Sequence, residues 1–376
     1  MSPAQESARD AWLTLLLAPG IGPVAGMRLI ERHGDPEAAL TTGPSGWRAA
    51  GIAEPLFEAL REPDTEAMTV CRDWLDGAED RTLLTIDDPR YPPRLLETGR
   101  PPLALFCQGD VDLLMRDQIA IVGARAASRQ GLEDARAFAG ELARQGLVIT
   151  SGLASGIDGA AHAAALDSGG GSTIAVAGTG PDRVYPARHR QLAHHIGAHG
   201  LIVSEFPPGT GAKPQHFPQR NRIIAGLSLG TLVVEAAAKS GSLITAKLAA
   251  EFGREVFAIP GSIHKPTARG CHALIREGAQ LVETVQEILT ALGRAGPATT
   301  ATLPGVSDPD ANPALSGGAR QTLAAVDDNG TAFDQLVART GLDVAALSSA
   351  LLELEIAGLV ASEPGGSFSR LRRARP

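Results

Sequence analysis

The sequence predicts an α/β fold: a mostly parallel, Rossmann-like sheet with helices on both faces. Short apolar runs that end in Gly or Ser alternate with helical stretches between about residues 100 and 285. Only 4% of the residues are aromatic while glycine is abundant, which favours close packing of helices on strands over an aromatic-rich β core. At 376 residues the chain is long enough for two or three domains.

Seven apolar runs are the expected strands of this sheet. They cover residues 118–123, 147–151, 172–177, 201–204, 231–235, 255–259 and 280–282. In an open parallel sheet, ligands bind outside the carboxyl ends of the strands. Functional residues are therefore expected directly after these runs.

The first 292 residues are expected to form two domains, a helical one and the Rossmann-like domain that contains the sheet. Residues 1–80 carry short helical patterns separated by Gly and Pro, and predict an N-terminal helical domain. Its Gly-Ile-Gly turn within Pro19–Ile30 is typical of a helix-hairpin-helix, which either binds a phosphate or only packs. The prolines from Asp87 to Pro102 predict an extended connector at the start of the Rossmann-like domain, residues 81–292.

The end of the chain predicts a linker and a third domain. Residues 293–318 are rich in Ala, Gly, Pro, Ser and Thr without an apolar face, and predict a flexible linker. Residues 319–376 show three helical patterns followed by a small hairpin, which predicts a winged-helix-like domain. The arginines from Arg370 onward are expected to form a solvated end.

Charge and composition exclude several classes of protein. The formal net charge of −8 argues against coating duplex DNA over the whole surface, but it allows a local basic groove. We expect a cytoplasmic protein without a membrane segment, since no signal peptide and no run of about 18 apolar residues is present. Cys71, Cys107 and Cys271 are expected to be buried, reduced thiols. His194, His195 and His199 are expected to lie on the surface without binding a metal.

The first expected strand leads into a candidate phosphate site. Gly123 lets the backbone turn tightly, and Arg125 and Ser128 precede a helix whose N-terminal amides attract an anion. Neither Gly-x-Gly-x-x-Gly nor a Gly-Lys-Ser/Thr loop occurs, which disfavours an enzyme that uses NAD or ATP. No cofactor is therefore expected.

The second expected strand leads into a glycine-rich loop. Gly152 and Gly156 permit close approach of a ligand to the backbone, and Ser155 can cap a helix or bind an oxygen. Asp158 and His162 lie four residues apart on one helix face, so we expect Asp158 to orient His162 and hold the loop. Catalysis by this pair is the less favoured alternative.

The stretch from Lys213 to Arg222 has the composition of a single-strand site. Arg220 and Arg222 flank Asn221 close to Phe217, which supplies cations for phosphates and a flat ring for a base. The alternative is that the arginines form ion pairs with acids such as Glu205. For Tyr185, after the third strand, stacking on a base and packing over its own loop are both open, with packing slightly favoured.

A second anion site is expected where a later strand ends. Ser240, Gly241 and Ser242 precede a helix that continues through Thr245, with Lys239 at the edge. Glu235 lies beneath this turn. Two roles are equally open for Glu235. It binds an arginine or a sugar hydroxyl as part of the site, or it pairs with Arg222 and only supports the structure.

Taken together, these motifs resemble the Rossmann-like core of the DprA/Smf family. The segments GAR-x-x-S, SGLASGIDGAAH, GTGPDRVYP, FPQRNRIIAGLS, VVEAAAKSGSLITA and GREVFAIPGS occur in the family's order between about residues 100 and 290. The resemblance implies single-stranded DNA binding, protection of incoming DNA during natural transformation of competent cells, loading of the RecA recombinase, and a homodimer joined through the Rossmann-like domain. The matching positions that would line the strand pocket are Arg125, Ser128, Phe217, Arg220, Asn221, Arg222, Lys239, Ser240, Gly241 and Ser242. Ala124 stands where the family often has serine, which removes one hydrogen bond to phosphate.

An enzymatic alternative is a nucleotide phosphoribohydrolase on a related fold. Glu235 and the helix start at Ser240 occupy places comparable to the catalytic elements of such enzymes. Their Gly-Gly-x-Gly-Thr loop is replaced here by Lys-Ser-Gly-Ser, however. We therefore expect a binding protein whose arginines converge on one track at the rim of the sheet.

Overall fold

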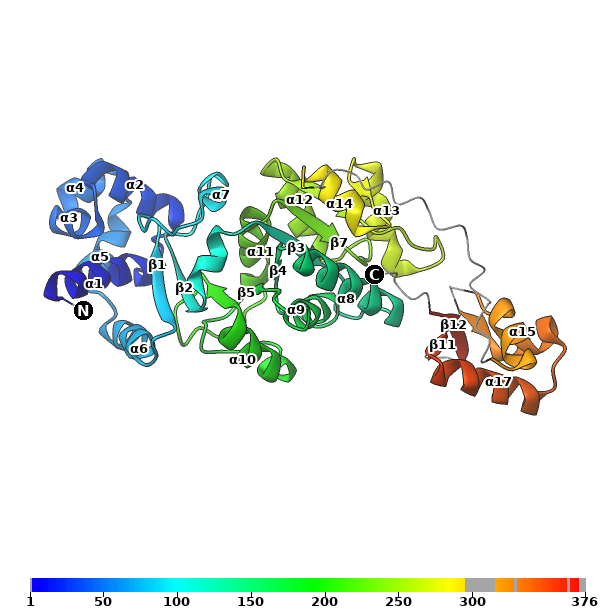
Figure 1. Ribbon diagram of the computed structural model, residues 1–376. Coiled ribbons are helices and arrows are strands. Elements are labelled where there is room, and N and C mark those ends of the chain that lie inside the picture. Colours follow the sequence, from blue (N-terminus) through cyan, green and yellow to red (C-terminus); the bar gives the residue numbers. More distant parts are fainter. Residues whose placement is uncertain (1, 295–314, 328–329, 364–365, 372–376) are drawn as a thin grey trace.

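The computed structural model describes residues 2–294, 315–327, 330–363 and 366–371 (Figure 1). None of the helices in these ranges has both the length and the hydropathy that crossing a bilayer requires. Most of the expected linker, at 295–314, and the tail from residue 372 lie outside the described residues, so both predictions stay as they are.

The N-terminal part is helical, as expected. Its elements are α1 (Pro3–Leu17), α2 (Pro23–His33), α3 (Pro36–Thr41), α4 (Gly43–Ala49), the 3-10 helix η1 (Glu54–Leu56), α5 (Phe57–Arg61) and α6 (Thr65–Asp76). Trp47 is buried at their centre, with its ring edge-on to Phe57. A Cβ on Gly26 of α2 would lie 2.2 Å from Leu103 Cδ1, so this helix packs directly against the chain that enters the sheet domain. The contact favours packing as the role of the hairpin.

Nine strands of the described chain form one sheet, in the order β1-β2-β6-β5-β4-β3-β7-β8-β9. The seven expected strands are confirmed as β3 (Gln118–Val122), β4 (Val148–Ser151), β5 (Thr173–Val176), β6 (Leu201–Ser204), β7 (Gly230–Val233), β8 (Glu255–Ala258) and β9 (Gln280–Leu281). From β6 through β9 every pairing is parallel. The mostly parallel α/β prediction is therefore correct.

One edge of the sheet differs from the expectation. β1 (Arg81–Thr85) and β2 (Ala104–Gly109) pair antiparallel with each other, and β2 pairs antiparallel with β6. The expected extended connector between them instead contains a turn and the short helix α7 (Pro93–Leu96). Proline fits the first turn of a helix, where no N–H bond is required, so the prolines here start a helix rather than exclude one.

Helices cover both faces of the sheet (Figure 1). α8 (Arg129–Arg144), α9 (Ile157–Leu166) and α14 (Val285–Ala291) share one apolar core with Ile119 and Ile121. α11 (His216–Leu227), α12 (Ser242–Glu251) and α13 (Arg269–Arg276) share the opposite core with Ala120 and Val122. Alternate residues of β3 thus serve the two faces, as the pleat requires. The remaining elements are α10 (Arg190–His199) and the 3-10 helices η2 (Val111–Met115), η3 (Ala187–His189) and η4 (Pro266–Ala268).

The order in which the chain adds strands to the sheet changes direction beside β3. The chain runs outward from β3 through β4 and β5 to β6, then returns to β7 on the other side of β3. The loops that follow β3, β4, β5 and β7 therefore meet at one rim of the sheet, next to the point where the order reverses. This is the position that open α/β sheets use for ligands.

The C-terminal part has the expected winged-helix arrangement. Its described elements are α15 (Gly317–Ala325), β10 (Thr331–Ala332), α16 (Phe333–Thr340), α17 (Val344–Ile356), β11 (Val360–Glu363) and β12 (Ser367–Arg370), with the strand order β10-β12-β11. Leu315 is buried in the core of this domain, which therefore includes residues four positions before its expected start at 319.

Candidate functional site

An aromatic ring and a guanidinium group meet at the rim. Phe217 lies in the first turn of α11, and the Arg125 side chain after β3 places its Cζ 5.2 Å from the centre of the Phe217 ring. Arg125 is exposed, and the described residues offer it no carboxylate partner. A cation over an aromatic face is attracted by the negative face of the ring. We call this pair, Arg125 on Phe217, the rim platform.

Tyr185 extends the rim platform. Its ring lies 5.4 Å from that of Phe217 at an angle of 46°, and the residue is 47% exposed. A Cβ added to Gly178, after β5, would lie 3.0 Å from the Phe217 ring, so this loop supports Phe217 closely. Tyr185 thus packs against Phe217 while much of its side chain stays open to solvent, and both of its expected roles remain open.

Arg220 does not lie on the open rim. It is 4% exposed and donates from Nη1 to the carbonyl oxygen of Val176 at the end of β5. Burial lowers the pKa of the Arg220 guanidinium to about 10 while the charge of Asp158 opposes this, so the group is charged at neutral pH. The expectation that Arg220 contributes an exposed cation is corrected: it is a buried charge beneath the rim platform.

Asp158 holds the loop after β4 and lies near this buried arginine. Its Oδ2 accepts hydrogen bonds from the backbone N–H groups of Gly152 at 3.1 Å and Ala154 at 3.3 Å. Burial raises the pKa of the Asp158 carboxyl, whereas the nearby Arg220 charge and the two amides lower it. A Cβ on Gly152 would lie 2.1 Å from Arg220 Nη1, so only glycine leaves room for the guanidinium.

His162 holds the same loop, but not through Asp158. Its Nε2 accepts from the Leu153 N–H at 3.3 Å, and its Nδ1 lies 2.7 Å from Thr173 Oγ1. Since the amide can only donate, the ring is neutral with its proton on Nδ1. The expected contact between Asp158 and His162 is therefore wrong, because the two side chains reach separate backbone groups, although both hold the loop.

Arg222 faces away from Arg220. The Nη2 of Arg222 pairs with Glu205 Oε1, and both side chains are 16% exposed. The two arginines are two positions apart on α11, which turns them about 200° apart around the helix axis. The ion-pair alternative therefore holds for Arg222, and the three arginines do not converge on one open track.

Glu235 joins the carboxyl ends of β7 and β3. Its two carboxylate oxygens accept from the Ser128 N–H at 2.9 Å and from Ser128 Oγ at 2.6 Å. Ser128 Oγ in turn accepts from the Gly131 N–H at 3.1 Å and caps α8. Glu235 thus pairs neither with Arg222 nor with any other described arginine, and it fixes the loop that carries Arg125.

The turn before α12 lies against α11. Asn221 Nδ2 donates to the Gly241 carbonyl oxygen at 3.3 Å, and the hydroxyls of Ser240 and Ser242 are 2.7 Å apart. Lys239 is exposed beside them. Ser242 and Thr245 are buried inside the helix, at 9% and 1% exposure, so the surface that this turn offers comes from residues 239–241.

The glycines at the rim bring the loops after β3 and β4 together. Gly156 has φ of +79°, and a Cβ there would lie 2.2 Å from the Ala124 carbonyl oxygen. A Cβ on Gly123 would lie 2.6 Å from Ile157 Cγ1. Ser155 is partly exposed in the same loop. The backbones of the two loops are therefore in contact, and Arg125 projects from a rigid corner.

Comparison with known proteins agrees with this architecture. Residues 82–293 match the family model described as DNA recombination-mediator protein A, which covers more than half of the chain. The chain belongs to the DNA recombination-mediator protein A family. The flanking parts match a DprA-like N-terminal HHH domain at 6–64 and a DprA winged helix domain at 306–366.

Similar members of this family are known from several bacteria. Protein Smf of Escherichia coli is 46% identical over 309 residues, which cover 80% of this chain and 80% of Smf. The structure of DNA processing protein A from Streptococcus pneumoniae superposes with a TM-score of 0.63 at 37% identity, covering 76% of this chain and 97% of the other. A structure concerned with the single-stranded DNA binding mode of DNA processing protein A from Helicobacter pylori superposes with a TM-score of 0.52 at 29% identity, covering 57% of this chain and 96% of the other.

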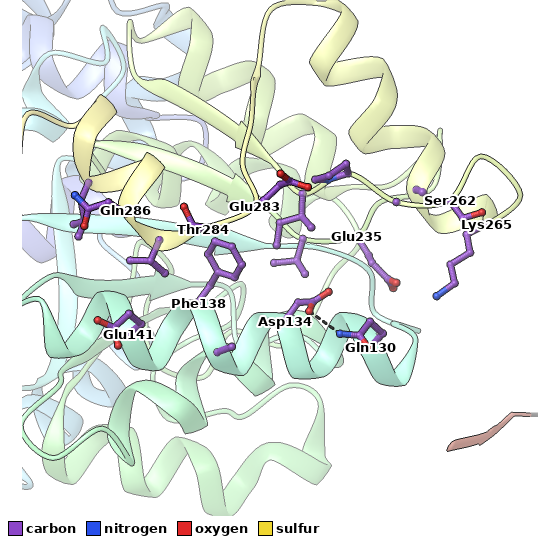
Figure 2. Close-up of a pocket in the computed structure, with 18 of the residues that line it drawn as sticks. Gln130, Asp134, Phe138, Glu141, Glu235, Ser262, Lys265, Glu283, Thr284 and Gln286 are labelled. Atoms are coloured by element: carbon purple, nitrogen blue, oxygen red, sulfur yellow. Dashed lines mark hydrogen bonds between the residues drawn. The ribbon is translucent and has the colours of Figure 1, made fainter. Parts of the chain in front are cut away.

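A cavity of about 1190 Å³ lies beside the rim in this family member, between α8, α14 and the loop after β8 (Figure 2). Its walls include neither residue of the rim platform, and their charged side chains are Asp134, Glu141, Glu235, Glu283, Arg144, Lys265 and Arg370. Burial is the main cause that raises the pKa of Asp134, and the charge of Glu235 adds to it. The walls thus carry charges of both signs and do not form a basic site for phosphates.

Cys71, Cys107 and Cys271 are buried and unpaired, as expected. His195 and His199 are exposed with their rings edge-on, and the described residues contain no group of three side chains that could hold a metal.

Proposed function

We propose that this chain binds single-stranded DNA at the carboxyl rim of its sheet, in the cytoplasm, and acts by binding rather than by catalysis. The observation that carries the proposal is the rim platform, where an exposed guanidinium lies on an aromatic ring. Aromatic faces stack on any base, and cations contact the backbone phosphates, which together suit an unpaired strand of any sequence. The single-strand binding of the related Helicobacter pylori protein supports the same assignment.

The exposed residues at the rim divide these tasks. Arg125 and Lys239 are exposed cations for phosphates, and Phe217, which is partly buried and lies under Arg125, offers the remaining surface of its ring to a base. The buried Arg220 and the paired Arg222 support the loops and α11. A few local cations are compatible with the overall net charge of −8, because phosphates then contact one groove and not the whole surface.

A wider role is part of the same proposal. We propose that the chain protects incoming DNA during natural transformation and loads RecA onto it as a homodimer joined through the Rossmann-like domain. Support comes from the family's description as a recombination mediator and from the match over all three domains. Faster assembly of RecA filaments on strands coated with a single-strand-binding protein, measured with and without this chain, tests the loading step. An unchanged rate contradicts it.

A salt titration tests the binding site. The logarithm of affinity for a 20-nucleotide strand should fall linearly with the logarithm of salt concentration, and Arg125→Ala should reduce the slope by about 0.7, the value of one lost phosphate contact on a single strand. Arg144→Ala is the matched control, because Arg144 is half-exposed, paired with Glu141 and located at the far end of α8. Equal slopes for wild type and Arg125→Ala, or equal affinity for single and double strands, refute the proposal.

The enzymatic alternative has its own test. A phosphoribohydrolase would release free base from AMP, and this release would depend on Glu235. In the structure both oxygens of Glu235 are occupied by Ser128, which argues against a carboxylate free to contact a substrate. Sustained release of base by wild type, lost in Glu235→Gln, would overturn the proposal of binding alone.

A further inference from the structure

Tyr185 is an exposed aromatic side chain on the functional rim. It is 47% exposed, and within the described residues its hydroxyl has no hydrogen-bond partner. The side chain therefore gains little from burial and nothing from a polar contact inside the protein. Tyrosine, which combines an apolar ring with a polar hydroxyl, is enriched at binding interfaces.

The loop that carries Tyr185 is held in place from several sides. Thr179 Oγ1 donates to the Arg183 carbonyl oxygen at 2.6 Å, and Ser204 Oγ donates to the Thr179 carbonyl oxygen at 2.6 Å. After the tyrosine, His189 Nδ1 lies 3.0 Å from the Leu153 carbonyl oxygen, which joins this loop to the one after β4. Tyr185 is thus presented from a fixed backbone, and its exposure is a feature of the fold.

The ring is also placed in line with the rim platform. Phe217 contacts the Tyr185 ring at 5.4 Å between centres and the Arg125 guanidinium at 5.2 Å. Three flat groups from three separate loops and helices therefore form one continuous surface. The tilt of 46° means that the two rings do not cover each other face to face, and Tyr185 keeps much of its side chain open to solvent.

From this arrangement we infer that Tyr185 is a second base-stacking residue, which binds the base next to the one on Phe217. The inference rests on the proposed single-strand function and deepens it, since it assigns two neighbouring nucleotides to the rim. Stacking involves the ring and no charge, so it contributes affinity without a contribution to the salt slope. This property separates Tyr185 from Arg125 in an experiment.

The test compares Tyr185→Ala and Tyr185→Phe with wild type on a 20-nucleotide strand at several salt concentrations. Tyr185→Ala should lose affinity by about 5- to 150-fold, the range for one stacked base, with an unchanged salt slope. Tyr185→Phe should bind like wild type, because the ring is retained. Met115→Ala is the control for loss of an exposed apolar side chain, since Met115 is also 47% exposed but precedes β3 and lies away from the rim.

An abasic strand distinguishes stacking from a change in the loop. On a strand of sugar and phosphate without bases, wild type and Tyr185→Ala should bind equally. Three results would each overturn the inference. Tyr185→Ala could lose as much affinity on the abasic strand as on the normal one, it could bind the normal strand like wild type, or Tyr185→Phe could show the same loss. If wild type itself fails to bind single strands, the proposed function fails instead, so the two failures are distinct.

Discussion

His162 makes the stability of the Rossmann-like domain depend on pH in a defined direction. The ring is fully buried, accepts the Leu153 N–H at Nε2 and contacts Thr173 with Nδ1. A proton on Nε2 would break the bond to Leu153 and place a positive charge in the core near Arg220. Burial is the main cause that lowers the pKa of His162, from 6.5 to about 3, and nearby His189 and Arg220 add to it.

The sign and size follow from proton linkage. The folded state keeps His162 neutral, whereas the unfolded chain takes up a proton below about pH 6.5, so the unfolded state binds more protons in this range. The stabilising contribution is complete above pH 6.5 and is lost as the pH falls from there toward 3. For the two pKa values given, the free energy of unfolding decreases by about 2 kcal/mol between pH 7 and pH 5.

Urea unfolding of wild type and His162→Gln at pH 7 and pH 5 measures this contribution. Glutamine is neutral at both values, and its amide can accept from Leu153 and donate to Thr173. Other titrating groups cancel in the difference between the two proteins. Wild type should therefore lose about 2 kcal/mol more than the variant, for the transition that reports the Rossmann-like domain. Equal losses in both proteins, or a histidine NMR signal of His162 that titrates near pH 6.5, would refute the reasoning.

Two further predictions concern packing and the C-terminal domain. Gly152→Ala should destabilise the protein by about 1–3 kcal/mol in thermal unfolding, because a Cβ would lie 2.1 Å from the buried Arg220 guanidinium. Gly241→Ala is the control and should leave the stability unchanged, because nothing lies within 4 Å of the new carbon. Ser349→Glu on the exposed face of α17 should leave affinity for duplex DNA unchanged, because this helix of 13 residues carries no Lys or Arg. A loss of about tenfold would show that α17 lies against phosphates.

Much of the fold was readable from local patterns. β3 to β9 begin and end within one or two residues of the expected runs. The central strands of this set are buried on both faces and therefore appear as short continuous apolar segments. Phe217 and Arg125 were both singled out from the residue types around them, and the structure brings them together. β1 was not anticipated, because Arg81–Thr85 is a half-polar run at the sheet edge, without the apolar continuity of the central strands.

Spacing along the chain did not reveal which polar side chains meet. Asp158 and His162 are one helical turn apart and yet bind different backbone groups. Glu235 and Ser128, which do meet, are separated by 107 residues. Arg220 and Arg222 have the same chemistry and nearly the same position, but one is buried beneath the rim and the other pairs with Glu205.

The sequence by itself determined the order of the strands from β3 to β9, the glycine-rich loops between them and the kinds of side chain that the loops carry. These depend on apolar periodicity and backbone freedom, which act over a few residues. Only the tertiary structure decided which arginine remains exposed at the rim and which is desolvated. That outcome depends on how each helix is turned against the sheet and on which strands become neighbours, and both are set by contacts between segments far apart in the chain.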